Sequence, residues 1–542
     1  MIISGRRLWP ATSERFALEE AEGGTVRYCH RPPNILRLIG ENAARYPDKI
    51  AVADDSGASL TYRELWLASG NWAGQLRGKW RVGSGCRVAL LLPGGVDFAA
   101  LFLGILRSGA AAVPLNTKLA PAELRTVLEN CAPELVVLAP TRQGKFEAAC
   151  PGYAEERVLV WPGGEAALRE EVGPSGSWEG LPDPAEGDCA ALIYTSGTTG
   201  KPKGVILTHG NVVHSVLSYA QTLPLSAEDT TVIAVPLFYV TGLVAQLLLF
   251  LALGGTAVIL RRFDENALLH LLQLNRATFF HAVETVFIKL LGAAARQSAD
   301  LPALRLAACG GGPVMPRTIA DLRAWLPHLD CRPVYGLTET SSPASIMPLD
   351  VNACLERVRS AGRPIPVVDC RVVDEAGADV PAGEVGELWL KGPVVSPGYF
   401  RNAAATDAAY HDGWFATGDL ARVDEEGFLY IQGRKKDMII RGGEKIFPNE
   451  VEAVLTGHPA VAEAAVVGIP DPIYGESVKA FIVPAPDTSV SGAELEEWLK
   501  QRLARYKVPS AYDFLPALPR SANGKILRRE LREAGPKPDL RE

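Results

Sequence analysis

The chain has 542 residues, more than a single hydrophobic core usually supports, so at least two domains are expected. Hydrophobic residues make up 47% and charged residues 22%, which is the balance of a soluble globular protein. The formal net charge of −7 argues against nucleic acid as the main partner, because no overall positive field would attract a polyanion.

The nine cysteines are scattered without a CxxC pair, which is typical of free thiols in a reducing compartment. Residues 1–16 lack the continuous apolar core of a secretory signal. The most apolar run, residues 240–255, is too short to span a bilayer and is interrupted by Thr241, Gly242 and Gln246. It is predicted to be a buried helix, and the protein is predicted to be cytoplasmic without a membrane span.

In the first two thirds of the chain, helical patterns alternate with short β-rich runs. Apolar residues at helical spacing predict helices over 33–47 and 62–77. The β-rich runs lie at residues 87–93, 133–140, 231–238 and 254–263. This alternation indicates an α/β fold, with βα units stacked on mixed or largely parallel sheets that form a large N-terminal body.

After about residue 360 the pattern changes to hairpin-like strands, over 386–400 and 427–443, which predict a β-rich subdomain. Beyond residue 443 the sequence reads as a small α+β unit. Its predicted elements are a helix over 448–459, strands over 461–471 and 477–485, and a helix over 491–506 capped by Ser491. We place the domain boundary near Gly433, giving domains 1–433 and 434–542.

The segment YTSGTTGKPKG, residues 194–204, has the chemistry of a phosphate-binding loop. It offers hydroxyl donors, glycines that let backbone N–H groups approach an anion, and two lysines. These residues are Thr195, Ser196, Gly197, Thr198, Thr199, Gly200, Lys201 and Lys203. A solvated surface turn has a similar composition. A Walker P-loop is excluded, because Pro202 stands where Ser or Thr must follow the lysine.

Read with the rest of the chain, this segment resembles the nucleotide-phosphate loop of the adenylate-forming superfamily. That superfamily includes acyl-CoA synthetases, adenylation domains of peptide synthetases and firefly luciferase. Five further motifs follow in the family's order: YGLTET (335–340), GELWLKGP (386–393), GWFATGDL (413–420), GRKKDMIIRGGEKIFPNEVE (433–452) and PRSANGKILRRE (519–530). The chain is thereby identified as a member, over nearly its whole length.

The resemblance implies a two-step ligase that uses ATP, Mg²⁺ and coenzyme A. A small-molecule carboxylic acid attacks the α-phosphorus of ATP to give an acyl-adenylate, and a thiol then displaces AMP. Because anions meet in both steps, catalysis should rest on positioning and fixed positive charge. The loop at residues 195–203 is then expected to hold the β- and γ-phosphates.

Several positions match the family's nucleotide site. By resemblance Glu339 is the Mg²⁺ ligand and Thr338 contacts the α-phosphate; a lone Glu in this setting could equally mark a helix start. Tyr335, followed by Gly336, matches the aromatic that packs along adenine, although an isolated Tyr is usually a core residue. Gly310, Gly311 and Gly312 in CGGGP match backbone that passes close to adenine and the acyl group, or form a simple strand-to-helix turn.

Two further residues match ribose contacts. Asp419 in TGDL would accept hydrogen bonds from both ribose hydroxyls, whereas a turn or cap aspartate is the plain alternative. Arg434 matches an arginine that also reaches the ribose.

The C-terminal domain is expected to move between the two steps. Lys525 matches the lysine that bridges the carboxylate and the α-phosphate during adenylation, where a solvated surface charge is the plain alternative. Lys436 matches the hinge about which the domain turns. Gly443 matches a glycine that lines the pantetheine tunnel, and it also suits a hairpin turn.

The acid-binding segment corresponds to residues 235–243, with Tyr239 and Gly242 as pocket residues. Many acyl- and aryl-CoA synthetases carry histidine where Tyr239 stands. The segment has no aspartate for an α-ammonium group and no arginine for a second carboxylate. We therefore expect an apolar monocarboxylate, either medium-chain aliphatic or aromatic.

Free coenzyme A is the expected acceptor, because the chain ends at Glu542 without a carrier domain. A separate acyl carrier protein is the main alternative. A luciferase-like oxygenase is more remote, and a regulator without turnover is disfavoured by the presence of both Glu339 and Lys525.

Overall fold

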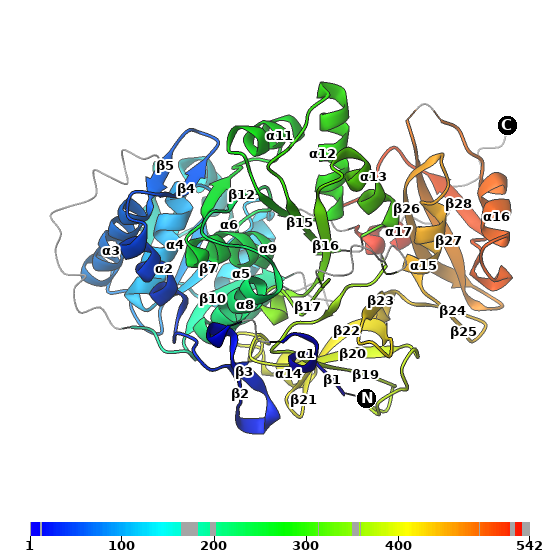
Figure 1. The fold of residues 1–542 in the computed structure, drawn as a ribbon, viewed down its shortest axis with the longest axis horizontal. Helices are drawn as coiled ribbons and strands as arrows, with labels where there is room; N and C mark the ends of the chain where they lie inside the picture. Colours follow the sequence, from blue (N-terminus) through cyan, green and yellow to red (C-terminus); the bar gives the residue numbers. More distant parts are fainter. Residues whose placement is uncertain are drawn as a thin grey trace.

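The protein folds as a large N-terminal body and a smaller C-terminal unit in the computed structural model (Figure 1). The structure describes residues 2–10, 13–163, 183–195, 202–312, 314–348, 357, 359–486, 488–520 and 526–533. We call residues 2–434 the large body and residues 439–533 the C-terminal unit. The predicted α/β class, with a β-rich part and a small α+β unit, is confirmed.

The large body contains a nine-stranded sheet in the order β18-β17-β16-β15-β14-β12-β13-β4-β5. Its middle is parallel, from β16 to β4, and its edge pairs are antiparallel. The strands are β4 (Ile50–Asp54), β5 (Ser59–Thr61), β12 (Thr230–Ile233), β13 (Thr256–Ile259), β14 (Phe279–Ala282), β15 (Leu306–Gly310), β16 (Asp330–Tyr335), β17 (Ser345–Ile346) and β18 (Arg363–Pro364).

A second, six-stranded sheet has the order β11-β10-β7-β6-β8-β9. Five of its strands are parallel, and β11 closes an antiparallel hairpin with β10. The strands are β6 (Arg87–Leu91), β7 (Ala111–Pro114), β8 (Leu135–Leu138), β9 (Val158–Val160), β10 (Cys189–Thr195) and β11 (Lys203–Thr208).

Helices separate and cover these two sheets, so the body is layered α/β/α/β/α. Alternate residues of a strand face different layers: Phe279 joins the central core, whereas Phe280 joins the core under α11–α13. The helices are α2 (Ile35–Arg45), α3 (Tyr62–Lys79), α4 (Val96–Ser108), α5 (Pro121–Cys131), α6 (Gln143–Ala149), α8 (His209–Thr222), α10 (Leu249–Leu253), α11 (Glu265–Leu274), α12 (Glu284–Gln297) and α13 (Pro316–Trp325). Helices α2–α4, α8 and α10 fill the middle layer, and α5 and α6 cover the outer face of the second sheet.

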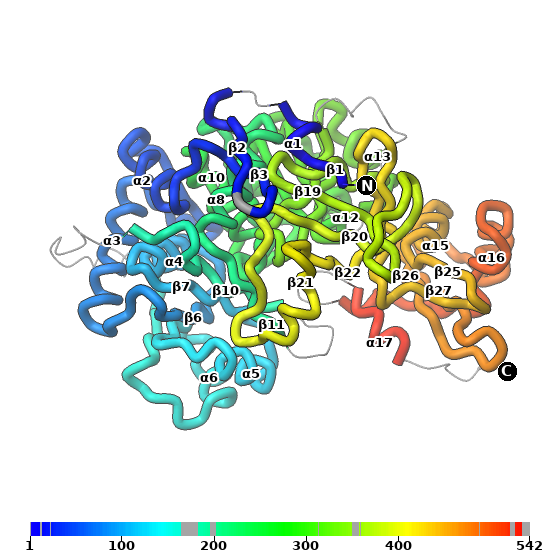
Figure 2. Tube along the Cα trace, turned by 90° about the horizontal axis from the view of Figure 1, so that it is seen from below, coloured from blue at the N-terminus to red at the C-terminus, as the bar shows by residue number. Residues whose placement is uncertain are grey.

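The β-rich part of the body is a six-stranded antiparallel sheet, β1-β19-β20-β22-β21, with β23 paired to β22. Figure 2 shows the N-terminal strand beside β19, a pairing that the sequence analysis did not predict. The elements are β1 (Ile2–Ser4), β19 (Asp369–Val373), β20 (Gly386–Lys391), α14 (Ala403–Asp407), β21 (Tyr410–His411), β22 (Trp414–Val423) and β23 (Leu429–Arg434). A short α1 (Gly5–Leu8) and the β2–β3 hairpin (Leu18–Glu20, Val26–Tyr28) complete the N-terminal segment.

The C-terminal unit is built on the sheet β25-β24-β27-β26, with β28 parallel to β27. Helices α15 and α16 pack on one face and α17 on the other. The elements are β24 (Ile439–Arg441), β25 (Glu444–Ile446), α15 (Pro448–Leu455), β26 (Val461–Asp471), β27 (Gly475–Pro484), α16 (Gly492–Lys500), β28 (Ala511–Phe514) and α17 (Arg528–Glu533).

Several predicted elements differ in extent; the strand expected over 427–443, for example, is divided into β23 and β24. The buried helix expected over 240–255 is buried but broken into α9 (Val240–Gly242), a π-helical turn (Leu243–Leu248) and α10. The helix capped by Ser491 ends at Lys500 rather than near residue 506. The strand expected over 386–400 ends at Lys391, because the chain then turns back toward β11 through a single bridge between Val205 and Tyr399.

The eight cysteines that the structure describes carry free thiols. No helix in the described ranges has both the length and the apolar character needed to cross a membrane.

Candidate active site

The predicted phosphate loop connects β10 to β11. The two strands pair in register, so Thr195 and Lys203 face each other across the base of the loop. The Nζ of Lys203 lies 4.8 Å from the ring centroid of Tyr399. The loop residues predicted to bind phosphate (Ser196, Gly197, Thr198, Thr199 and Gly200) lie outside the described residues, as does Lys201.

Glu339 sits in a short 3-10 helix, Thr338–Thr340, just after β16. The hydroxyl of Tyr399 donates a 2.9 Å hydrogen bond to Glu339 Oε1. The backbone N–H of Ser396 donates to the Glu339 carbonyl at 2.7 Å. Burial and the Glu339 carboxylate both raise the pKa of Tyr399, so its hydroxyl remains a donor at neutral pH.

Tyr335, Asp419 and Arg434 form a connected polar group. Asp419 on β22 is 4% exposed and pairs in register with Arg434 on β23. Its carboxylate accepts a 2.7 Å bond from the Tyr335 hydroxyl and a 2.8 Å ion pair from Arg434 Nε. Burial and Asp419 raise the pKa of Tyr335. Burial lowers the pKa of Arg434, but the negative charge of Asp419, together with Tyr335 and the carboxylates of Glu339 and Asp437, outweighs it and raises the pKa overall, so Arg434 stays protonated and Tyr335 stays neutral at neutral pH.

The predicted glycines lie where the β15 and β16 strands end, at the carboxyl edge of the parallel sheet. A Cβ on Gly336 would lie 1.5 Å from the carbonyl oxygen of Ser342, and one on Gly310 would lie 2.5 Å from a β16 carbonyl. These two positions therefore exclude side chains for packing reasons. Gly311 adopts φ of +83°, and a Cβ on Gly312 would meet no atom within 4 Å. Open space at Gly312 is compatible with a ligand passing close to the backbone.

The predicted acid-binding residues lie after β12. Tyr239 is half-buried, with its ring centroid 4.6 Å from that of Phe238, and burial raises its pKa to about 12. Gly242 lies inside the same turn, because a Cβ there would come within 2.5 Å of the Val235 carbonyl oxygen. Packing of the turn therefore explains why position 242 needs a glycine, independently of any role in binding the acid.

The residues suit a magnesium ion that arrives with its nucleotide. Among the described residues, no three His, Cys, Asp or Glu side chains gather into a ready-made metal cluster. Mg²⁺ characteristically takes one or two carboxylates and completes its shell with phosphate oxygens and water. Glu339, a single carboxylate beside the lysine-bearing hairpin, fits that pattern.

The predicted hinge residue, Lys436, is exposed in the connector η9 (Lys435–Asp437), between the sheet that ends with β23 and the sheet that begins with β24. The connector is tied to both sides. Lys435 pairs with Glu387 of the large body at 3.0 Å, and Asp437 pairs with Arg532 of the C-terminal unit at 3.0 Å.

Lys525 lies outside the described residues, but Arg520 and Ile526, which flank its segment, form a β-bridge. Arg520 pairs with Glu463 at 2.7 Å. Burial raises the pKa of Glu284 on α12, and the charges of Arg520 and Glu463 act on the same carboxyl group in opposite directions, so this side of the C-terminal unit faces the large body.

Gly443 lies at the tip of the β24–β25 hairpin with φ of +89°, and a Cβ there would meet nothing within 4 Å. Figures 1 and 2 both show this hairpin far from the β10–β11 hairpin. In this arrangement the structure brings Glu339, Tyr335, Asp419, Arg434 and Lys203 into one region and leaves Gly443 apart from them.

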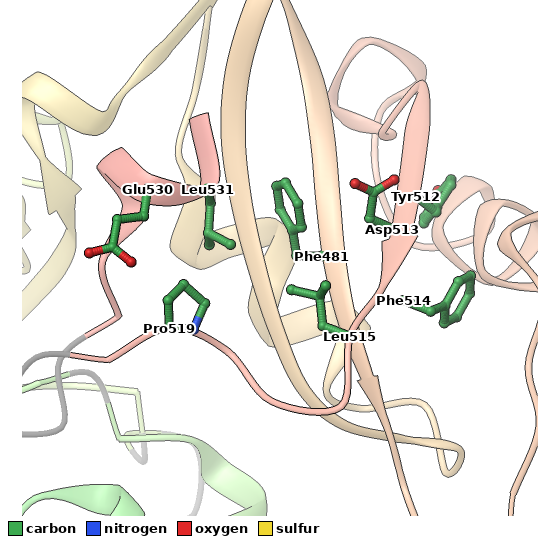
Figure 3. A pocket seen from close by; sticks show the side chains of 8 residues that line it. All are labelled: Phe481, Tyr512, Asp513, Phe514, Leu515, Pro519, Glu530 and Leu531. Atoms are coloured by element: carbon green, nitrogen blue, oxygen red, sulfur yellow. The ribbon is translucent and has the colours of Figure 1, made fainter. Parts of the chain in front are cut away.

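A separate pocket lies on the C-terminal unit between β27, β28 and α17 (Figure 3). Phe481, Leu515, Pro519 and Leu531 contribute its apolar wall, and Asp513 and Glu530 lie at its edge. Of the predicted site residues that the structure describes, none lines it.

Tyr399 and Ser396 are contacts of Glu339 that sequence reasoning missed. Tyr399 lies 60 residues from Glu339 in the chain, in a stretch that reads as a strand. Only the return of the chain to β11 brings it close, and no local pattern signals that return.

Comparison with known proteins identifies the family. The family model described as AMP-binding enzyme matches residues 39–400, and the model for the AMP-binding enzyme C-terminal domain matches residues 450–525. A feruloyl-CoA synthase of an Amycolatopsis species is 36% identical over 489 residues, covering 90% of this chain and 96% of the relative. A 2-succinylbenzoate–CoA ligase of Bacillus velezensis is 37% identical, covering 91% and 96%.

Solved structures agree in fold. ATP-bound MatB from Rhodopseudomonas palustris is 30% identical with a TM-score of 0.83, covering 92% of this chain and 99% of that one. The o-succinylbenzoate coenzyme A synthetase of Bacillus subtilis with ATP and magnesium is 33% identical with a TM-score of 0.80, covering 92% and 99%. The chain therefore belongs to the AMP-binding enzyme family of the adenylate-forming superfamily and is an AMP-forming acid–CoA ligase that uses ATP, Mg²⁺ and coenzyme A.

Proposed function

We propose that this ligase activates an apolar monocarboxylic acid, aromatic or medium-chain aliphatic. The observation that carries the proposal is the aromatic pair Phe238–Tyr239 on the turn after β12, within a segment, 235–243, that has no charged residue. The relatives' names span feruloyl, indoleacetate, long-chain fatty acid and sulfoacetate substrates, so residues of the pocket rather than family membership must select the acid.

The first half-reaction depends on groups that hold the nucleotide still. Asp419 and Arg434 would hold the ribose, and Tyr335 with Gly336 and the glycines at 310–312 would line adenine. Asp419 is buried, and its carboxylate is oriented by two donors, so it would accept from ribose hydroxyls without first reorganising.

The phosphates would lie between the β10–β11 hairpin and Glu339. Residues 195–200 and Lys203 would hold the β- and γ-phosphates, Thr338 the α-phosphate, and Glu339 the magnesium ion. Bound Mg²⁺ supplies charge neutralisation at the phosphates. Lys525 would neutralise the carboxylate and α-phosphate as they approach each other.

The second half-reaction needs access for a thiol. We assign residues 1–433 and 434–542 as domains that turn about Lys436, so that the hairpin carrying Gly443 replaces the segment carrying Lys525. The exposed connector and the open space around Gly443 support this assignment. Free coenzyme A is the proposed acceptor, and a carrier protein is the alternative to be tested.

The proposal is tested by acid-dependent ATP–pyrophosphate exchange over a panel of aromatic, aliphatic, amino and dicarboxylic acids, without a thiol. The best acid is then incubated with coenzyme A or with a holo-carrier protein. We expect exchange with apolar monocarboxylates and product formation with coenzyme A. Preference for a dicarboxylate or an amino acid would contradict the substrate class, and product formation only on the carrier would contradict the acceptor.

A further inference from the structure

Helix α8 carries three polar side chains four residues apart: Asn211, Ser215 and Tyr219. Positions separated by four residues lie along one face of a helix. All three are buried, and each bonds to a loop that flanks Glu339. We call these three residues the α8 ladder.

The first residue of the ladder fixes the loop after β20. Asn211 Nδ2 donates to the carbonyl oxygens of Pro393 at 2.7 Å and Val395 at 3.1 Å. Its Oδ1 accepts the backbone N–H of Thr208, so the amide is held at both ends. The loop fixed in this way is the one whose Ser396 N–H and Tyr399 hydroxyl bond to Glu339.

The other two residues fix the chain on the opposite side of Glu339. Ser215 Oγ donates to the Ser341 carbonyl at 2.8 Å, and the Tyr219 hydroxyl lies 3.0 Å from Ser342 Oγ. Ser341 and Ser342 have φ of 55° and 113°, in the left-handed region that residues other than glycine rarely adopt without outside support. The ladder supplies that support directly after the Glu339 turn.

The two loops are also joined to each other. Ser341 Oγ donates to the Val394 carbonyl at 3.0 Å. Glu339 is therefore held within a closed set of hydrogen bonds, anchored on the buried helix α8, that includes its own carbonyl and its Oε1 atom. Such networks orient a ligand side chain more narrowly than packing alone.

We propose that the α8 ladder positions Glu339 and thereby sets how much Mg²⁺ increases the affinity of the site for ATP. Asn211, Ser215 and Tyr219 are positioning residues, since their side chains bond to the loops around Glu339. The inference rests on the proposed role of Glu339 as the Mg²⁺ ligand. It assigns a task to the end of the GELWLKGP motif, whose Pro393 carbonyl is one of the anchored groups.

The test measures binding without turnover. The dissociation constant of ATP is determined by isothermal titration calorimetry with Mg²⁺ and with EDTA, in the absence of any acid, for wild type, Tyr219→Phe and Ser215→Ala. The dissociation constant in EDTA divided by that with Mg²⁺ reports how much the metal ion strengthens ATP binding. We expect this ratio to fall by about threefold to tenfold in each variant, with ATP affinity in EDTA unchanged.

Thr222→Val is the matched control. Thr222 is buried on the same helix, and its hydroxyl donates to the Ser218 carbonyl of that helix instead of to a loop near Glu339. A double variant, Tyr219→Phe with Ser342→Ala, should lower the ratio no further than Tyr219→Phe alone, because the two hydroxyls are hydrogen-bond partners of each other.

The outcomes separate the two claims. If Glu339→Gln leaves the ratio unchanged, the proposed metal role of Glu339 is wrong and the inference falls with it. If Glu339→Gln lowers the ratio to near one but the ladder variants have the same ratio as Thr222→Val, the metal role of Glu339 stands and the ladder is merely structural. Loss of ATP affinity in EDTA equal to the loss in Mg²⁺ would also overturn the proposal.

Discussion

At the scale of single residues, the best-defined part of the site is the group formed by Tyr335, Asp419 and Arg434. The sequence predicted each of them from a separate motif, and the structure brings them within hydrogen-bonding distance. Strand pairing explains this, since Asp419 and Arg434 are register partners on β22 and β23. No local pattern predicted that the Tyr335 hydroxyl would bond to Asp419, because that contact spans 84 residues.

Replacing Tyr335 by Phe should weaken nucleotide binding. The change removes a hydrogen bond to a buried carboxylate, a bond to a charged group that typically contributes about 1.5–3 kcal/mol. We expect the KM for ATP to rise roughly tenfold or more, with little change in KM for the acid. Steady-state kinetics measure both constants. Tyr430→Phe is the control, because Tyr430 donates to Asp424 in the same sheet; an equal rise in that variant would contradict a specific role for Tyr335.

His281 on β14 should make the fold sensitive to acid. Burial lowers its pKa from 6.5 to about 3, so the folded protein keeps it neutral while the unfolded chain takes up a proton below about pH 6.5. Stability is therefore lost as pH falls through that window, by about 2 kcal/mol near pH 5 from this one group.

His281→Phe removes that group and should flatten the fall in melting temperature between about pH 7.5 and about pH 5. The imidazole ring of His281 packs edge-on against the rings of Tyr219 and Phe279, and a phenylalanine ring can make the same contacts. Thermal unfolding followed by circular dichroism measures the slope. The exposed His411, stacked on Trp389, provides the control His411→Phe. Equal slopes in wild type and His281→Phe would refute the assignment.

At the scale of elements, periodic patterns predicted some of the helices and strands, such as α2, α3, β26 and β27, because burial on one face leaves a signature in the sequence. Strand β26, for instance, places Ala464 and Val466 against α15 and α16, and Ala465 and Val467 against α17. Irregular elements were not predictable in this way. The π-helical turn at Leu243–Leu248 interrupts an apolar run that reads as one helix, and the return of residues 392–400 to β11 depends on distant contacts.

The β24–β25 hairpin is the element that should matter only in thioester formation. Gly443→Leu should leave acid-dependent ATP–pyrophosphate exchange within about twofold of wild type and lower thioester formation by roughly a hundredfold, since a side chain at this position would obstruct the thiol. Both half-reactions are assayed separately.

The matched control for that variant is Gly57→Leu. Gly57 lies in the β4–β5 hairpin with φ of +86° and open space around its Cβ position, so it carries the same backbone strain at a site remote from the chemistry. An unimpaired second half-reaction in Gly443→Leu, or an equal loss in Gly57→Leu, would contradict the tunnel assignment.

At the scale of the whole molecule, few polar contacts besides the connector join the two parts within the described ranges. An exposed ion pair, Lys445 with Glu375 at 3.4 Å, links the β24–β25 hairpin to the large body, and such pairs contribute little to stability. This suits the proposal that the C-terminal unit leaves one position and takes up another between the two half-reactions. The sequence predicted two domains from length and a change of pattern, but their relative placement depends on surfaces that no local pattern specifies.

We propose that one chain performs two half-reactions with different parts of its C-terminal unit. Lys525→Ala tests it most directly, with Lys500→Ala, an exposed lysine paired with Glu496 and Glu497, as the control. We predict that ATP–pyrophosphate exchange falls by roughly a hundredfold or more, while thioester formation from preformed acyl-adenylate and coenzyme A stays within about threefold of wild type. Equal loss of both half-reactions would contradict the account.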